Sequence, residues 1–247
     1  MSRSNTSLRF LIIPVLMACV VGMAACGAGS ADEKTLFTKY FMSSKIGDNL
    51  TLANIATVVF NPQTDGQMMS FNITAVTEEK TTPLQMKASS EELRKAIAEE
   101  NDFSKKKRDY QDANATAIEK LVKMEQTNKK ITGKEADLQK TWSKWRDDAK
   151  AMAQKVSEVR KKANEFRPIV EISAQDQRNP IDVTAYDCDL ISKDVTIEGQ
   201  VKPPTGDTVT KSYVFTLQRA TLKNVKDGKD QAGRWVITGR KDAANAK

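Results

Sequence analysis

The chain has 247 residues and a net charge of +7, with 39 lysines and arginines against 32 aspartates and glutamates. It contains no histidine, which excludes Ser-His-Asp and Cys-His nucleophile pairs and any zinc site with imidazole ligands. A chain of this length can bury the core of one or two domains.

Residues 1–25 have the three-part layout of an export signal. Arg3 and Arg9 form a basic start, and the apolar run that follows is too short to span a bilayer comfortably. We therefore expect a leader that is removed, not a transmembrane helix. The run ends in Met23, Ala24, Ala25 and Cys26.

These four residues resemble the lipobox of bacterial lipoproteins, in which an aliphatic residue and two small residues precede a cysteine that is acylated. The resemblance implies cleavage before Cys26 and a diacylglyceryl and palmitoyl anchor on that residue. It also implies a protein held on a bacterial membrane, facing the periplasm or the cell exterior, with residues 26–32 as acylated cysteine and tether. The competing interpretations are acylation at Cys19 and an ordinary secretory leader cut near Ala25.

Residues 33–88 are expected to supply helices and the first strand of an α+β domain. Apolar residues recur at helical spacing over residues 36–41 and again, after a glycine, over residues 50–59. Between residues 69 and 75, apolar and polar side chains alternate, which is typical of a strand with one buried face.

Residues 89–167 predict a long antiparallel helical hairpin with a coiled-coil seam. Ser89 and Glu92 have the spacing of a capping box, and apolar residues then recur every three or four positions. The seam is interrupted at residues 131–134, where Gly133 can end one helix, so we expect the turn there.

Residues 168–247 are expected to complete the domain as an antiparallel β meander. Runs of alternating apolar and polar residues are separated by turn sequences rich in proline, glycine and aspartate. The predicted fold class is therefore α+β: a small antiparallel sheet with short N-terminal helices and a long coiled-coil helical hairpin inserted after the first strand.

The segments Gly47-Asp48, Val195 to Val201 and Gly233 to Ile237 resemble the corresponding parts of NTF2-like and cystatin-like α+β domains. A rival resemblance is to the periplasmic adaptor proteins of efflux pumps, which also insert an α-hairpin into β domains. No lipoyl-like glycine pattern flanks residues 89–167, so we rank this second resemblance lower.

The surplus basic charge lies in the predicted hairpin. If the helices fold back at residues 131–134, two basic runs become neighbours and form a patch that can meet lipid phosphates or another anionic polymer. The alternative is an ordinary solvated helix surface. Nucleic acid is not expected as a partner, because export separates the protein from it. The patch consists of Lys105, Lys106, Lys107, Arg108, Arg160, Lys161 and Lys162.

Several other residues are better explained by packing than by chemistry. Trp142 and Trp145 occupy seam positions, which favours core packing over an exposed docking motif. Cys188 lies on the apolar side of its strand and is expected to be an inert core residue. We expect no cofactor and no metal, because the acidic residues of this region lack the spacing and glycine of a calcium loop. These residues are Asp182, Asp187, Asp189 and Asp194.

We therefore expect a lipid-anchored envelope lipoprotein with a structural or protein-interaction role and no enzymatic activity. Residues 89–167 would engage a protein partner or self-associate. The first alternative, from the NTF2-like resemblance, is a domain that binds a small ligand or uses carboxylates and Tyr213 in acid-base chemistry. The second is an accessory protein of an envelope transport assembly.

Overall fold

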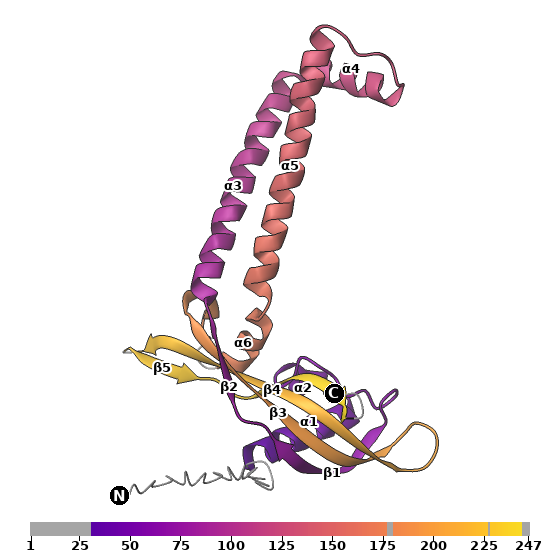
Figure 1. Cartoon of the computed structure of the whole chain (residues 1–247), viewed down its shortest axis with the longest axis vertical. Helices are drawn as coiled ribbons and strands as arrows, with labels where there is room; N and C mark the ends of the chain where they lie inside the picture. The colour runs from indigo at the N-terminus through magenta and orange to yellow at the C-terminus, as the bar shows by residue number, and fades with distance from the viewer. Residues whose placement is uncertain (1–30, 177–179, 227, 244–247) are drawn as a thin grey trace, which may run out of the picture.

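The computed structural model describes residues 31–176, 180–226 and 228–243. It shows a sheet domain from which a long helical arm projects (Figure 1). The strands pair with one another in antiparallel fashion, and helices make up much of the rest of the described chain. The predicted α+β class is thus confirmed.

The sheet has six strands, and the two longest form its centre. They are β1 (Gln67–Val76), β2 (Lys80–Leu84), β3 (Cys188–Lys202), β4 (Val209–Lys226), β5 (Lys229–Ala232) and β6 (Val236–Asp242). β3 and β4 pair as a long hairpin. β1 and β2 pair with successive parts of β3, and β5 and β6 do the same along β4. Each edge of the sheet is therefore made of two strands in line.

The β3–β4 hairpin buries opposite faces at its two ends. Its register is continuous from Cys188 to Val201, so side chains alternate strictly between the faces. The buried residues are even-numbered at one end, as in Cys188 and Leu190, and odd-numbered further on, as in Val195 and Ile197. The domain therefore has two cores, one on each side of the sheet.

The first core lies under α1 (Ala31–Ile46), which is followed by the short helix α2 (Asn49–Ala53). Aromatic side chains of α1 pack against β4: the ring of Phe37 lies 5.1 Å from that of Phe215, and the ring of Tyr40 lies 6.0 Å from it. All three side chains are fully buried. The odd-numbered face of the sheet is therefore filled by aromatic residues of α1.

The second core lies on the opposite face, where the arm joins the sheet. α6 (Arg167–Ala174) follows the arm and places Val170 in a cluster with Met86, Cys188 and Leu222. These four side chains are almost completely buried. The two ends of the arm are thus held by the same apolar cluster.

Ser173 fixes α6 to the sheet through its hydroxyl. Its Oγ accepts a hydrogen bond from the Ala220 amide and donates one to the Arg234 carbonyl, each at 2.8 Å. Gly233 permits this close approach, because a Cβ at that position would lie 2.6 Å from the Ser173 carbonyl oxygen. The base of the arm therefore has a defined position on the sheet.

The arm contains α3 (Met86–Ala113), α4 (Ala115–Gln126) and α5 (Lys134–Asn164). The prediction of a hairpin inserted after the first strand is wrong: helices precede and follow β1, and β2 separates it from α3. The predicted capping box is also wrong, since the Ser89 amide donates to the Gln85 carbonyl at 3.0 Å within the first turn of α3.

The helix α2 and the junction between the arm and α6 also differ from the sequence expectations in detail. α2 is five residues long and does not continue to residue 59. Pro168 follows the end of the arm as expected, but it also lies in the first turn of α6, where a proline lacks only an amide that has no helical partner.

The Cys188 thiol is expected to resist labelling in the folded protein. It is 2% exposed, and burial raises its pKa to about 11, so it is neither accessible nor ionised at neutral pH. Maleimide labelling followed by mass spectrometry should show slow modification in buffer and rapid modification in denaturant. An Ile46→Cys variant, at a position that is 74% exposed, should react quickly in both conditions. Equal native rates would contradict the packing of the second core.

Candidate interaction surfaces

The arm is held together by contacts between its own helices. α3 and α5 lie side by side, and α4 lies across their far end (Figure 1). Lys162 pairs with Glu92 at 3.5 Å and Lys155 pairs with Glu99 at 2.6 Å, so the two helices run antiparallel. These side chains are at least half exposed, and each pair therefore contributes little to stability.

Aromatic residues fill the middle of the arm. The ring of Trp145 lies 5.4 Å from that of Phe103 and 5.7 Å from that of Tyr110, both on α3. Trp142 is 8% exposed and packs within the arm. Both tryptophans are thus packing residues of the arm, as their seam positions predict.

α4 forms a small core of its own at the tip of the arm. Ile118 and Leu121 pack against Trp142 of α5, and Leu121 is fully buried. The Arg146 guanidinium holds the Glu125 carboxylate with two hydrogen bonds of 3.0 Å. Hydrogen bonding from Arg146 keeps the pKa of Glu125 below its ordinary value. The tip is therefore an ordered surface rather than a simple turn.

The structure separates the two basic runs that the sequence analysis places together. Lys107 lies 5.6 Å from the ring of Trp142, whereas Lys162 pairs with Glu92 near the base of the arm. About 15 residues of α3 lie between these two levels, which corresponds to about 22 Å along a helix. The predicted common patch is therefore wrong. The remaining residues of the two runs are exposed: Lys105, Lys106, Arg108, Arg160 and Lys161.

Because of α4, the pairing register of α3 with α5 differs from that of the hairpin expected from the sequence. A single turn at residues 131–134 would bring residues 105–108 opposite residues 160–162. Instead the 12 residues of α4 leave the antiparallel pair and cross the tip, so each part of α3 meets an earlier part of α5. The basic side chains are spread along the arm as a result.

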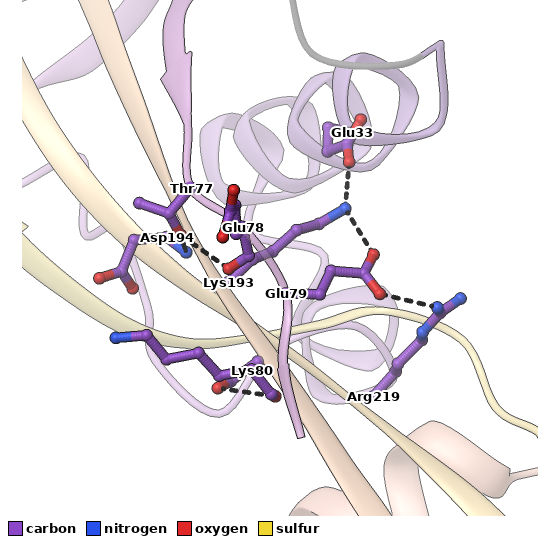
Figure 2. A network of polar contacts seen from close by, with 9 residues as sticks. Glu33, Thr77, Glu78, Glu79, Lys80, Lys193, Asp194 and Arg219 are labelled. Carbon is purple, nitrogen blue, oxygen red and sulfur yellow. Dashed lines mark hydrogen bonds and ion pairs between the residues drawn. The ribbon is translucent and has the colours of Figure 1, made fainter. Parts of the chain in front are cut away.

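A partly buried group of charges joins α1 to the sheet (Figure 2). The Lys193 ammonium on β3 is hydrogen-bonded to the Glu33 carboxylate of α1 and lies 3.6 Å from Glu79. Arg219 on β4 pairs with the other oxygen of Glu79 at 3.2 Å. The Lys193 and Glu33 side chains are only 8% and 4% exposed. We refer to Glu33, Glu79, Lys193, Arg219 and Trp235 as the charge cluster.

Trp235 provides the remaining contact surface for the two cations of the charge cluster. The Lys193 Nζ lies 4.1 Å from the centre of the indole ring, and the Arg219 Cζ lies 4.6 Å from it. Cations near an aromatic face are stabilised by the ring quadrupole, most strongly when they are desolvated. Among the described residues, the buried Arg219 Nε has no hydrogen-bond partner.

The sequence analysis did not predict the charge cluster, although the pattern of apolar residues in β3 indicates where it lies. The buried positions change from even to odd between Leu190 and Val195, and Lys193 lies within that change. On the odd-numbered face its side chain points to the α1 side of the sheet, beyond the aromatic core. A lysine there has to find a buried carboxylate, and Glu33 provides it.

The residues considered for chemistry in the sheet domain have structural contacts. Tyr213 is 3% exposed, and burial raises the pKa of its hydroxyl. In the described part of the chain, no group of three or more cysteine, aspartate or glutamate side chains is arranged to hold a metal ion. Each of the four aspartates has a structural partner. Asp182, Asp187 and Asp194 accept hydrogen bonds from Thr184, Lys87 and Thr216, respectively. Asp189 forms an ion pair with Lys223.

The lipobox residues Met23, Ala24, Ala25 and Cys26 lie outside the described residues. Over residues 31–176, 180–226 and 228–243, none of the helices combines the length and apolar character needed to cross a bilayer. A scan against protein-family models and searches of curated proteins and of solved structures found no match to this chain.

Proposed function

We propose that the protein is a lipid-anchored lipoprotein of a bacterial envelope, attached through Cys26, and that its arm binds a protein partner or a second copy of the chain. The observation that carries this proposal is the projecting arm. α5 alone has 31 residues, or about 46 Å of helix, and it carries the tip well away from the sheet. Such a projection offers surface for recognition at a distance from the anchor.

The packing of the sheet domain supports a structural rather than a catalytic role. A small-ligand pocket would need an open sheet face, but Phe215, Leu217 and Ile237 are fully buried in the core beneath α1. The buried carboxylate of Glu33 is hydrogen-bonded to Lys193. The interior of the domain is thus used for packing.

Metabolic palmitate labelling tests the anchor. The wild-type protein should incorporate label and remain with the membrane fraction, and the Cys26→Ala variant should do neither. A Cys19→Ala variant is the matched control and should behave as wild type, because Cys19 lies within the leader. Label that survives in Cys26→Ala would overturn the proposed attachment site.

Photo-crosslinking in intact cells tests the arm. A crosslinking amino acid at Lys123, a 70% exposed position on α4, should give a covalent adduct with a partner or a second copy. The same amino acid at Lys211, an exposed position on β4, should give none. Identical adduct patterns from both positions, or no adduct from the tip, would argue against recognition by the arm.

A further inference from the structure

One surface of α1 and α2 carries large apolar side chains that are exposed. Met42 is 62% exposed, Ile46 is 74% exposed and Leu50, at the start of α2, is 82% exposed. Met42 and Ile46 are one turn apart and line the same shallow, mostly apolar groove along the outer side of α1. This side is opposite the one that packs on the sheet.

Lysines border this apolar stripe on both sides. At 3.6 residues per turn, Lys34 and Lys45 fall on one side of Met42 and Lys39 falls on the other. None of these three lysines forms an ion pair with any residue that the structure describes. We call this surface the α1 face: Lys34, Lys39, Met42, Lys45, Ile46 and Leu50.

The polar groups within the α1 face are already satisfied by the helix. The hydroxyls of Thr35 and Thr38 donate to the carbonyls of Ala31 and Lys34 at 2.7 and 2.8 Å. Covering these threonines with an apolar layer would therefore cost little desolvation. The carboxylates of Asp32 and Asp48 lie at the two ends of the face, so lysines remain in the majority.

We propose that the α1 face rests on the surface of the lipid bilayer that holds the anchor, with its apolar side chains among the acyl chains and its lysines at anionic headgroups. This inference rests on the proposed attachment at Cys26. A helix with an apolar stripe between lysines matches the interface of a bilayer, where the apolar side chains enter and the ammonium groups reach the phosphates.

The short tether favours the bilayer as the binding partner of the α1 face. Cys26 is five residues from the start of α1, so even a fully extended tether holds this helix within about 18 Å of the acylated residue. At such a distance a weak surface becomes effective, because tethering raises its local concentration at the bilayer to the millimolar range. Each lysine near an anionic surface adds about 1 kcal/mol of attraction.

The placement of α1 in the fold gives this contact a consequence for the arm. α1 belongs to the sheet domain, and the tip formed by α4 is at the opposite end of the molecule (Figure 1). The charge cluster fixes the first turn of α1 to β3, so the helix cannot turn independently of the sheet. A bilayer contact at the α1 face therefore sets the direction in which the arm points.

Fluorescence quenching of the full-length, acylated protein in vesicles tests the proposal. An environment-sensitive fluorophore is attached to an Ile46→Cys variant and, as the control, to a Met69→Cys variant on β1, which is 53% exposed. The vesicles contain phosphatidylcholine with about 30 mol% phosphatidylglycerol, and a fraction of the lipids carries a quencher on the acyl chain. We expect several-fold stronger quenching at position 46 than at position 69.

The remaining outcomes separate this inference from the anchor itself. A protein that carries palmitate and floats with vesicles, but shows equal quenching at both positions, overturns the α1 face and leaves the anchor standing. A protein that is not acylated overturns both. A blue shift at position 46 that grows with protein concentration in detergent, without lipid, assigns the face to a second copy and also overturns the proposal. Replacing all three lysines with glutamine should weaken quenching in anionic vesicles only.

Discussion

Replacing Lys193 with methionine is expected to lower the free energy of unfolding by about 3 kcal/mol. Methionine has a similar length, so the variant loses the charge with little change in volume. The Glu33 carboxylate, 4% exposed, stays desolvated in the variant and no longer has the Lys193 ammonium to balance it. Breaking a buried ion pair on one side is costly for this reason. The variant also loses the contact of the ammonium with Trp235.

A second lysine provides the matched control. Lys155 also pairs with a glutamate at 2.6 Å, but its side chain is 54% exposed and its partner Glu99 is 50% exposed. Lys155→Met should therefore lower the free energy of unfolding far less than Lys193→Met does. Chemical denaturation followed by circular dichroism measures both variants. Equal losses from the two substitutions would show that the Lys193–Glu33 pair is not desolvated as the structure indicates.

A partial recovery in a double variant would strengthen this interpretation. Adding Glu33→Gln to Lys193→Met removes the buried charge that the single variant leaves behind, so the double variant should be more stable than Lys193→Met alone. Because Glu33 lies in the first turn of α1, the interaction energy between the two substitutions also measures how strongly this helix is attached to the sheet.

The main elements of the sheet domain could be predicted from local patterns. The helical spacing around Phe37 and the alternation around Phe71, Val195 and Phe215 identify α1, β1, β3 and β4. β2 could not be found in this way, because its Lys-Thr-Thr-Pro-Leu sequence is exposed along an edge and shows no alternation. In the sequence of β3, the apolar residues shift from even to odd positions, which indicates that the strand buries one face at one end and the other face at the other end. Which helices cover each face could not be predicted from this shift.

The surfaces were harder to predict because they depend on pairing between distant segments. Asn114 interrupts the apolar seam between Tyr110 and Ala117, but a single polar seam residue does not show that α3 ends there and that α4 crosses the tip. The exposed positions of Met42 and Ile46 follow from which side of α1 packs on the sheet, since both sides of this helix carry apolar residues. A helix with apolar residues on two sides has no single amphipathic direction.

Replacing Leu121 with alanine is expected to open the tip of the arm without unfolding the sheet domain. Leu121 is fully buried between α4 and Trp142, and removing a buried leucine costs about 3 kcal/mol, which corresponds to a hundredfold increase in local opening. The tip cluster is separate from the two cores of the sheet domain, so the loss should stay local. Hydrogen exchange of the α4 amides should accelerate by about this factor.

Leu50→Ala makes the same chemical change at a position that is 82% exposed and should leave the exchange of α4 unchanged. Trypsin cleavage after Lys123 offers an independent measure, because this exposed lysine lies within α4 and its backbone can enter the protease only when the helix separates from α5 and unwinds. If Leu121→Ala instead lowers the stability of the whole chain and protects α4 as before, the arm and the sheet unfold as one unit. If the tip opens as expected, crosslinking from Lys123 should fall with it, since recognition through α4 requires the helix to be held across the end of the arm.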